Sequence, residues 1–295
     1  MRVLLTLLAS LLPLMAQAPL AQRIMHTDPA SYRSFKSVHG GPGQLDYMTL
    51  LDGQALDANL IFLHRGVIQP KSGIGHHFHH ECEEMFIIFD GEAEFTVDGR
   101  TSRLKAPAGA PSRMGHSHAI YNPTDRPIEW MNINVGLVRG KYDVFDLNDG
   151  RVGAPLDVIP VFMTMRLDRA LLRPVQGLTG GKGTAQHRRA FQPEVFSTAW
   201  AYVDHVVLPP GASIGRHLHK GVSEFYYVMA GGGTAEVAPA GSTGGYETAP
   251  ISKGDAIPVR AGEAHAFANT GGEPLEFMVV GIAREKGKID TVEIH

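Results

Sequence analysis

Histidine and acidic side chains crowd into one short stretch of the chain, GHHFHHECEEMF at residues 75–86. Within it, His77 and His79 are two positions apart, and Glu84 follows after a gap of four residues. Residues i and i+2 of a strand point to the same face, so both imidazoles can project into one interior. We expect Glu84 to begin the next strand and to bring a carboxylate beside them. Such a cluster is typical of a site for one metal ion.

The same spacing occurs again 140 residues further on, in GRHLHKGVSEFYYVMAG. His217, His219 and Glu224 occupy the corresponding positions there. The glycines that follow each cluster, Gly91 and Gly231, keep the same offset. A long repeat in constant register indicates two tandem domains of one architecture.

A later pair of blocks, GHSHAIYN and GEAHAFAN, adds one histidine to each copy. Their offset is 147 residues, so seven extra residues lie between the blocks of the second copy, and we place them in the loop 240–250. Three imidazole nitrogens and one carboxylate oxygen suit a divalent Mn, Fe, Ni, Cu or Co ion that keeps positions open for water, substrate or dioxygen. We predict one such ion per domain, without choosing among the five. The predicted ligands are His77, His79, Glu84 and His118 in the first domain, and His217, His219, Glu224 and His265 in the second.

The doubled pattern, H-x-H-x4-E-x6-G followed by G-x2-H-x3-N, resembles that of the cupin superfamily, and two copies in one chain resemble a bicupin. The resemblance covers roughly residues 45–137 and 196–283. It implies an all-β protein of two tandem cupin barrels of the jelly-roll type. Bicupins with complete sites include quercetinase-type dioxygenases and oxalate oxidases and decarboxylases. The resemblance also implies that Glu84 or Glu224 can act as a general base.

The other ligand-type side chains of the opening stretch are not assigned to the metal. His76 and His80 fall outside the pair that both copies share, so we expect them to be solvated or to support the ligands. We choose Glu84 and not Glu83 as the carboxylate ligand, because only Glu84 keeps the spacing to Gly91 that the second copy repeats. For Cys82 we expect a buried or turn position, with a soft metal ligand as the alternative.

Several aromatic residues are expected around the second cluster. Strand parity places Tyr226 on the face of Glu224 and Phe267 on the face of His265. The preceding strand adds Trp200 and Tyr202, although only one of its faces can lie inside. We predict Tyr226 as a proton donor to the substrate. The residues Trp200, Tyr202 and Phe267 are predicted to line the substrate site, and plain barrel core is the alternative.

Two arginines occupy equivalent places, because Arg113 and Arg260 each precede a motif glycine by two residues. They are candidates for binding a substrate carboxylate, and pairing between the two lobes is the alternative. The oxalate-specific relatives carry an arginine three residues before the first metal histidine, where this chain has Ile74 and Ile214. Lys220, which directly follows His219, resembles the residue that the oxalate-specific branch has there. The absence of the arginine nevertheless favours a larger, apolar or phenolic substrate.

The elements that must position these residues are short and rich in β-forming residues. Glycine and proline punctuate the chain every eight to twelve residues, with runs such as EMFIIF between them, which indicates a sandwich or barrel. Between 139 and 192 the texture changes: we expect a short helix in VFMTMRLDRALLRP and a loop in GLTGGKGTAQHRR. The predicted division is an N-terminal cupin domain at 26–140, an interdomain segment at 141–195 and a C-terminal cupin domain at 196–286.

The composition and the first residues of the chain indicate which partners and which cellular location to expect. A net charge of −3 has no basic excess, so a nucleic-acid partner is not expected. The start, MRVLLTLLASLLPLMAQA, is typical of a secretory signal peptide at 1–18 and not of a membrane span. We therefore predict a periplasmic or secreted protein without a membrane anchor after signal removal. The single cysteine allows no internal disulfide.

The predicted function is that of an exported metalloenzyme. The first choice is a mononuclear-metal oxidoreductase of the dioxygenase type that acts on a small organic substrate, with dioxygen as the partner. The first alternative is an isomerase or lyase that uses the ion as a Lewis acid, and the second is a non-catalytic binding protein. The oligomeric state stays open, and a homo-oligomer is allowed.

Of the two sites, we expect the second to do the chemistry. Its aromatic companions and the glycine-rich loop 240–250, a candidate mobile lid, favour a substrate there. The first site is expected to be crowded by the additional imidazoles of His76, His80 and His116. On this hypothesis Glu224 is the essential base, and loss of Glu84 leaves residual activity.

Overall fold

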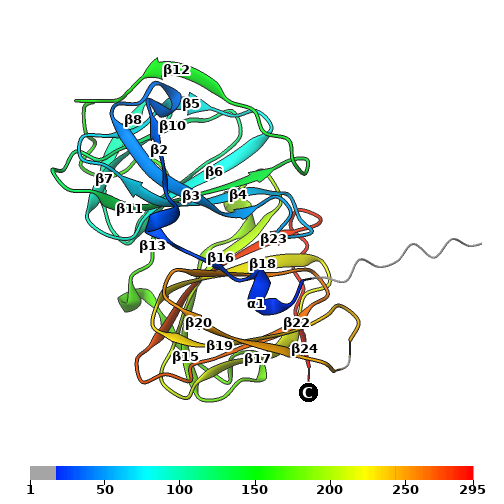
Figure 1. The fold of residues 1–295 in the computed structure, drawn as a ribbon. Coiled ribbons are helices and arrows are strands. Elements are labelled where there is room, and N and C mark those ends of the chain that lie inside the picture. The colour runs from blue at the N-terminus through cyan, green and yellow to red at the C-terminus, as the bar shows by residue number, and fades with distance from the viewer. Residues whose placement is uncertain (1–17, 243, 295) are drawn as a thin grey trace, which may run out of the picture.

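A computed structural model describes residues 18–242 and 244–294. These residues form two β-barrel domains of the same design, each built from one seven-stranded and one five-stranded sheet (Figure 1). The predicted all-β fold of two tandem barrels is confirmed. In the described part of the chain, helix is confined to α1 (Leu20–Arg23) and five 3-10 turns, η1 (Pro29–Ser31), η2 (Val38–Gly40), η3 (Arg169–Leu171), η4 (Leu178–Gly180) and η5 (Pro193–Val195).

The N-terminal barrel pairs its strands in the orders β13-β9-β6-β11-β4-β3-β2 and β12-β5-β10-β7-β8. Its strands are β2 (Arg33–Lys36), β3 (Gln44–Asp52), β4 (Leu60–Ile68), β5 (Gly73–Phe78), β6 (Cys82–Ile88), β7 (Glu92–Val97), β8 (Arg100–Lys105), β9 (Ala108–Ser112), β10 (Ser117–Tyr121), β11 (Ile128–Gly136), β12 (Phe145–Asp149) and β13 (Met165–Arg166).

The C-terminal barrel repeats this plan in the orders β1-β21-β18-β23-β16-β15-β14 and β20-β19-β22-β17-β24. Its strands are β1 (Met25–His26), β14 (Arg173–Gln176), β15 (Thr184–Phe191), β16 (Trp200–Leu208), β17 (Ser213–Leu218), β18 (Val222–Ala230), β19 (Gly232–Ala238), β20 (Glu247–Ser252), β21 (Asp255–Val259), β22 (Ala264–Ala268), β23 (Leu275–Ala283) and β24 (Val292–Glu293).

The large sheets of the two domains pack against each other. Along β6, Phe86 and Ile88 point into the N-terminal barrel, whereas Met85 and Ile87 belong to the apolar cluster between the domains. Both faces of such a strand are therefore buried, which explains why EMFIIF is a continuous apolar run without polar alternation. Each large side chain buried in this way contributes about 1.5–3 kcal/mol to folding.

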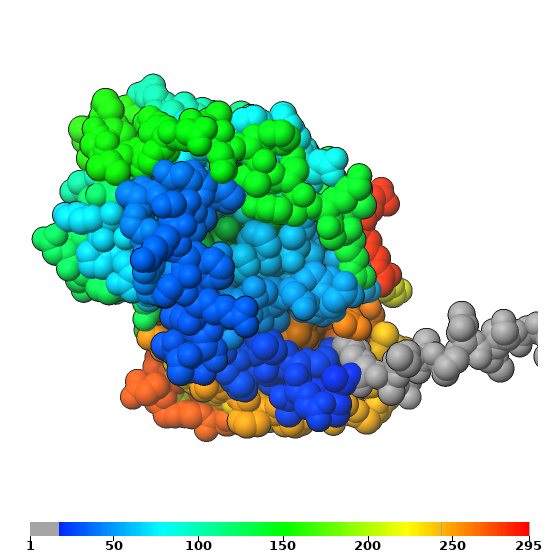
Figure 2. All heavy atoms as spheres, turned by 45° about the horizontal axis from the view of Figure 1, so that its top comes forward, coloured from blue at the N-terminus to red at the C-terminus, as the bar shows by residue number. Residues whose placement is uncertain are grey.

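Two short strands cross from one half of the chain to the other domain. Strand β1 pairs with β21 of the C-terminal barrel, and β13 pairs with β9 of the N-terminal barrel. Figure 2 shows the first described residues, in dark blue, running over the orange surface of the C-terminal domain. The predicted start of the N-terminal domain at residue 26 therefore lies within a segment that completes the opposite barrel.

The predicted interdomain segment 141–195 supplies strands to both barrels, which corrects the sequence-based division. Strands β14 and β15 belong to the C-terminal sheet and match β2 and β3 at the same offset of 140 residues. The expected helix is replaced by β13, η3 and β14, and most of the expected loop GLTGGKGTAQHRR is η4 and β15. Local composition misled here, because pairing with the neighbouring strand β16 decides the conformation of β15.

The seven additional residues of the second copy lie where the sequence placed them. Strands β7 and β8 join through the two-residue turn Asp98–Gly99, whereas the equivalent β19 and β20 are separated by residues 239–246. No helix in the described part of the chain is long and apolar enough to cross a membrane. The predicted signal segment, apart from Ala18, lies outside the described residues.

Candidate metal centres

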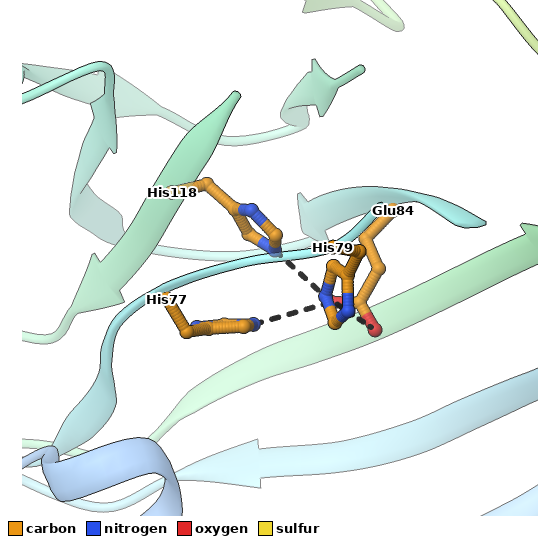
Figure 3. A group of neighbouring side chains, drawn as sticks. All are labelled: His77, His79, Glu84 and His118. Carbon is orange, nitrogen blue, oxygen red and sulfur yellow. Dashed lines mark hydrogen bonds and ion pairs between the residues drawn. The ribbon is translucent and has the colours of Figure 1, made fainter. Parts of the chain in front are cut away.

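The first centre gathers side chains from three strands of the N-terminal barrel. Strand β5 carries His77, His79 directly follows it, β6 carries Glu84, and β10 places His118 opposite His77. The four side chains point toward one another, and their ligand atoms all lie within 4.8 Å of one another (Figure 3). The Nε2 atom of His118 is 3.2 Å from Oε2 of Glu84. The structure therefore brings the four predicted residues together, and their binding of a metal stays a prediction.

Backbone carbonyls fix how two of these imidazoles are turned. Nδ1 of His77 donates to the carbonyl of Gly75 at 2.7 Å, and Nδ1 of His79 donates to that of Asp143. The Nε2 atoms of both rings are buried and have no hydrogen-bond partner among the described residues. Leaving buried nitrogens unpartnered costs about 1–3 kcal/mol each, and a metal ion would satisfy them. These residues fit a divalent cation.

The ionisation of the first centre is also that of a metal site. Burial lowers the pKa of His118 to about 3, and the neighbouring His77 adds to this effect. Burial alone would raise the pKa of Glu84, but the imidazoles around it hold that pKa well below its usual range. Burial opposes protonation of His79, yet Cys82 and Glu84 raise its pKa to about 11. A divalent ion bound beside Glu84 would take the place of the proton that His79 otherwise carries.

The second centre has the same construction in the C-terminal barrel. His217 on β17 pairs across to His265 on β22, and the Nε2 of His265 lies 2.9 Å from Oε2 of Glu224. Burial and His265 lower the pKa of His217 to about 3. Burial opposes protonation of His219 as well, but Glu224 raises its pKa to about 9. In each copy the second histidine of the H-x-H pair has a raised pKa beside the glutamate, whereas the histidine with the lowered pKa is His118 in the first centre and His217 in the second.

Two aspartates that the sequence analysis missed support the centres from the segments after each barrel. Asp143 and Asp290 accept a hydrogen bond from the Nδ1 of His79 and His219, respectively, through their backbone carbonyls. Their carboxylates accept the backbone N–H groups of the two residues after each histidine. A signal was available, because GKYD at 140–143 and GKID at 287–290 repeat at the offset of 147.

The centres differ in what holds the carboxylate. In the first, the side-chain amides of Asn134 and Asn132 donate to Glu84 at 2.9 and 3.2 Å. In the second, the hydroxyl of Tyr202 donates to Glu224 at 2.7 Å, and that of Tyr226 at 3.2 Å. The Tyr226 hydroxyl also lies 3.2 Å from Nε2 of His265, one of the predicted metal ligands.

A cavity of about 190 Å³ adjoins the first centre. It has no lysine or arginine in its lining, and burial lowers the pKa of His64 to about 4 against the opposing charge of Glu84. The imidazole of His64 is therefore neutral at pH 7. The residues that line this cavity are Val38, His39, Tyr47, Phe62, His64, Ile74, His77, Glu84, Trp130, Asn132 and Tyr142.

A smaller cavity, of about 130 Å³, adjoins the second centre and is more polar. Arg189 lines it and forms a two-pronged ion pair with Asp204 at 2.8 and 3.0 Å. The guanidinium also lies 4.1 Å above the ring of Tyr202. The described residues of the loop 240–250 line neither cavity, so the expected lid over the second site is not found there.

The expected crowding of the first site by imidazoles is wrong. His76 bonds to Ser117 on the outer side of the sheet, and His116 bonds to Asp98 in an exposed turn. Neither His76, His80 nor His116 belongs to the metal-type cluster. Strand parity is the reason, because neighbours of an inward-pointing residue point outward.

The residues predicted to line the second substrate site divide into three groups. Tyr202 and Tyr226 contact Glu224, as described above. Phe267 packs against the ring of Tyr226, with centroids 4.0 Å apart and the rings tilted by 32°, and does not line the cavity. The prediction that Trp200 lines the substrate site is wrong. A break in the β16–β23 register between Trp200 and Tyr202 turns the indole into the interdomain cluster, where it stacks on Phe196.

The two equivalent arginines hold the domains together and do not line a metal cavity, which corrects their predicted role in substrate binding. Arg113 donates to the carbonyls of Val195 and Glu194 in the other domain. In the reciprocal contact, Arg260 donates to the carbonyls of Ala55 and Gln54. The alternative of pairing between the lobes is the one that the structure bears out.

Two barrels in tandem, each with three imidazoles and one carboxylate inside, define a two-domain cupin, a bicupin. The chain belongs to the cupin family, whose model for the cupin domain matches residues 64–134 and again 204–281. It is 30% identical over 118 residues to an oxalate-binding protein of Thermotoga maritima, a match that covers 40% of this chain and 92% of that protein.

Solved structures show the same fold over most of the chain. Oxalate decarboxylase from Bacillus subtilis at pH 4.6 matches with a TM-score of 0.63 and 18% identity, over 92% of this chain and 78% of that one. The formate complex of Lactobacillus farciminis oxalate decarboxylase matches with a TM-score of 0.64 and 16% identity, over 92% of this chain and 88% of that one. Another structure of the Bacillus subtilis enzyme, from a study of its Mn(II) centres, matches with a TM-score of 0.60 and 19% identity, over 92% of this chain and 79% of that one.

Proposed function

We propose that the protein is a metal-dependent enzyme that acts on a small organic substrate at the centre of its N-terminal domain. One observation carries the proposal: three imidazoles and one carboxylate, arranged as a metal-type cluster, adjoin a cavity that is lined by aromatic rings and contains no lysine or arginine. The Mn(II) centres of the structurally similar Bacillus subtilis enzyme support Mn as the first ion to test. The cavity supports a substrate site, because a purely structural metal site is normally closed by its ligands.

We assign the chemistry to oxidoreduction of the dioxygenase type. His77, His79, Glu84 and His118 would hold the ion, which would supply Lewis-acid and redox chemistry for a substrate oxygen. Both atoms of one O2 enter the product, so the reaction needs no separate reductant. In the protein, the amides of Asn132 and Asn134 hold the Glu84 carboxylate in place, and this carboxylate accepts the proton of a substrate hydroxyl.

This proposal moves the chemistry from the second centre, where the sequence analysis expected it, to the first. The three reasons for the second centre do not hold: its aromatic lining is the poorer one, the described residues of the loop 240–250 do not line its cavity, and the imidazoles expected to crowd the first centre lie outside that cluster. The hydroxyls of Tyr202 and Tyr226 also occupy space beside Glu224. A metal-holding role with a smaller contribution to turnover suits the second centre better.

A lyase that decarboxylates a small dicarboxylate is the second candidate. The similarity to an oxalate-binding protein and to oxalate decarboxylases supports this candidate. So does Arg189, a cation beside the second centre that could bind a carboxylate. Against it, Ile74 and Ile214 stand where the oxalate-specific branch has its arginine, and both line the cavities. Arg189 is also already paired with Asp204.

The deciding experiment uses protein purified from a periplasmic expression system and loaded in turn with Mn, Fe, Ni, Cu and Co. Metal content is measured by mass spectrometry, and dioxygen uptake is followed over a panel of catechols, flavonols, keto acids and oxalate. Consumption of dioxygen with a phenolic substrate, lost on chelation, supports the oxidoreductase. Release of CO2 and formate from oxalate without net dioxygen uptake supports the lyase, and inertness of all loaded forms contradicts both.

Export belongs to the proposal as well. The apolar start of the chain supports a signal peptide and hence a periplasmic or secreted enzyme. N-terminal sequencing of the protein from its native cells should find a start near residue 19. Uncleaved protein in the cytoplasm would contradict this part of the proposal.

A further inference from the structure

Two of the residues that line the cavity beside the first centre each carry a buried polar atom that the protein leaves without a hydrogen-bond partner in the described part of the chain. The indole Nε1–H of Trp130 and the side-chain Oδ1 of Asn132 have no hydrogen-bond partner among the described residues. Their residues are 1% and 5% exposed, and both line the cavity together with Glu84 and His77. A buried unpartnered polar group costs about 1–3 kcal/mol, so a ligand that satisfies both atoms gains affinity from each.

The chemistry of the two atoms is complementary. An indole nitrogen can only donate, and an amide oxygen can only accept. The orientation of the Asn132 amide is fixed, because its NH2 group donates to Glu84. A ligand that satisfies both atoms must therefore present one acceptor and one donor, which a hydroxyl group does. A dicarboxylate such as oxalate presents acceptors only at neutral pH and would leave Oδ1 of Asn132 unpartnered.

The rest of the cavity limits the size and character of the ligand. Its volume of about 190 Å³ is below the roughly 300–1,000 Å³ of pockets for drug-sized ligands, which favours a single ring over a fused system such as a flavonol. Aromatic side chains surround the space: the rings of Phe62 and His64 stack in parallel at 3.9 Å, and the ring of Tyr142 lies 5.8 Å from Phe62.

We infer that Trp130 and Asn132 determine the substrate specificity of the first centre, and that they select a small monocyclic molecule with a free hydroxyl group, of which catechol is the simplest example. This inference rests on the proposed function for the identity of the working centre and narrows its substrate class. The second centre lacks both groups, because Phe277 and Val279 occupy the equivalent positions on β23.

The second domain also supplies the test variants, Trp130→Phe and Asn132→Val, since both replacements already occur in the same strand position of the same fold. Binding is measured by calorimetry on the metal-loaded protein without dioxygen. The probes are catechol, 1,2-dimethoxybenzene, which keeps the acceptors but has no donor, and oxalate. Trp200→Phe, which removes an indole outside the cavity, is the matched control. Metal content and thermal unfolding are measured for every variant, since Asn132 also contacts Glu84.

We expect each cavity variant to weaken catechol binding about three- to tenfold, and Trp200→Phe to leave it unchanged. Asn132→Val should leave the binding of 1,2-dimethoxybenzene unchanged, because that probe offers no donor to Oδ1. Catechol affinity in both cavity variants that equals that of the parent protein overturns the inference, as does a loss of oxalate affinity in Asn132→Val as large as the loss of catechol affinity. If the binding pattern holds without dioxygen uptake, the proposed oxidoreductase fails while this inference stands; uptake that neither variant affects gives the opposite result.

Discussion

The two metal-type centres of this chain have the same four side chains and different surroundings. Each has three imidazoles and one carboxylate within 4.8 Å, and each has a histidine whose Nδ1 donates to an aspartate carbonyl from the following segment. The carboxylate, by contrast, receives two amide groups in the first centre and two phenol groups in the second. The duplicated barrels thus share the means to hold an ion and differ in what lies next to it.

That difference has chemical consequences. An amide keeps its protons at all accessible pH values, so Asn132 and Asn134 can position Glu84 but cannot exchange a proton with it. A phenol is in principle also an acid, but burial and the charge of Glu224 raise the pKa of Tyr202 and Tyr226 well above its usual value, so these two hydroxyls act as hydrogen-bond donors that keep their protons. The cavity beside the first centre is aromatic and has no lysine or arginine in its lining, whereas the cavity beside the second contains the Arg189–Asp204 ion pair. Identical ligands therefore do not imply identical roles.

The largest expected effect separates the two carboxylates. Glu84→Ala should lower turnover by about 10²- to 10⁴-fold, because it removes both a predicted metal ligand and the proposed base. Glu224→Ala should leave a measurable fraction of activity. Steady-state kinetics, with metal content determined for each variant, measures both. If Glu224→Ala is the inactive variant, the C-terminal centre does the chemistry and the argument from the cavities fails.

Metal occupancy is the next comparison. The parent protein should hold two ions per chain, and His79→Ala or His219→Ala should each hold one, as measured by mass spectrometry after dialysis. Chelation of both ions should lower the unfolding temperature, because an ion at a thousand times its dissociation constant stabilises the folded state by about 4 kcal/mol. Two ions retained in either histidine variant would show that the cluster concerned is not the binding site.

A smaller effect is expected from the groups around each carboxylate. Asn134→Ala should weaken metal binding in the first centre, and Tyr202→Phe should weaken it in the second, each by about 10- to 100-fold. Phenylalanine already stands at the position equivalent to Tyr202, at Phe62, so the second variant is compatible with the fold. Competition with a fluorescent chelator gives the affinities. A loss in the wrong centre for either variant would mean that the two sites are coupled.

The smallest expected effect concerns the reciprocal contacts between the domains. Arg113→Ala and Arg260→Ala each remove two hydrogen bonds to backbone carbonyls, so each should lower the free energy of unfolding by about 1–3 kcal/mol. Neither should change which substrates bind. Arg100→Ala, which breaks an exposed ion pair with Asp157, is the control and should cost under 1 kcal/mol. A selective loss of binding for carboxylate substrates in Arg113→Ala would revive its predicted role in substrate recognition.

The sequence alone determined the fold and the membership of both clusters. Repetition in register did this: His77 and His79 could be chosen over His76 and His80 because the second copy retains only the former pair. The geometry followed from strand periodicity, since residues two apart share a face. The location of the seven additional residues followed from the change of offset between the repeated blocks.

Only the tertiary structure decided which neighbours the centres have. Trp200 and Tyr202 are two residues apart and should share a face, but a register break in β16 sends one to the domain interface and the other to Glu224. Arg113 and Arg260 contact carbonyls of the opposite domain, and Tyr142 reaches the first cavity from beyond the barrel. A repeat in the sequence reports what two domains share along their strands; bulges, interdomain contacts and the path of returning segments depend on long-range packing, which no local pattern encodes.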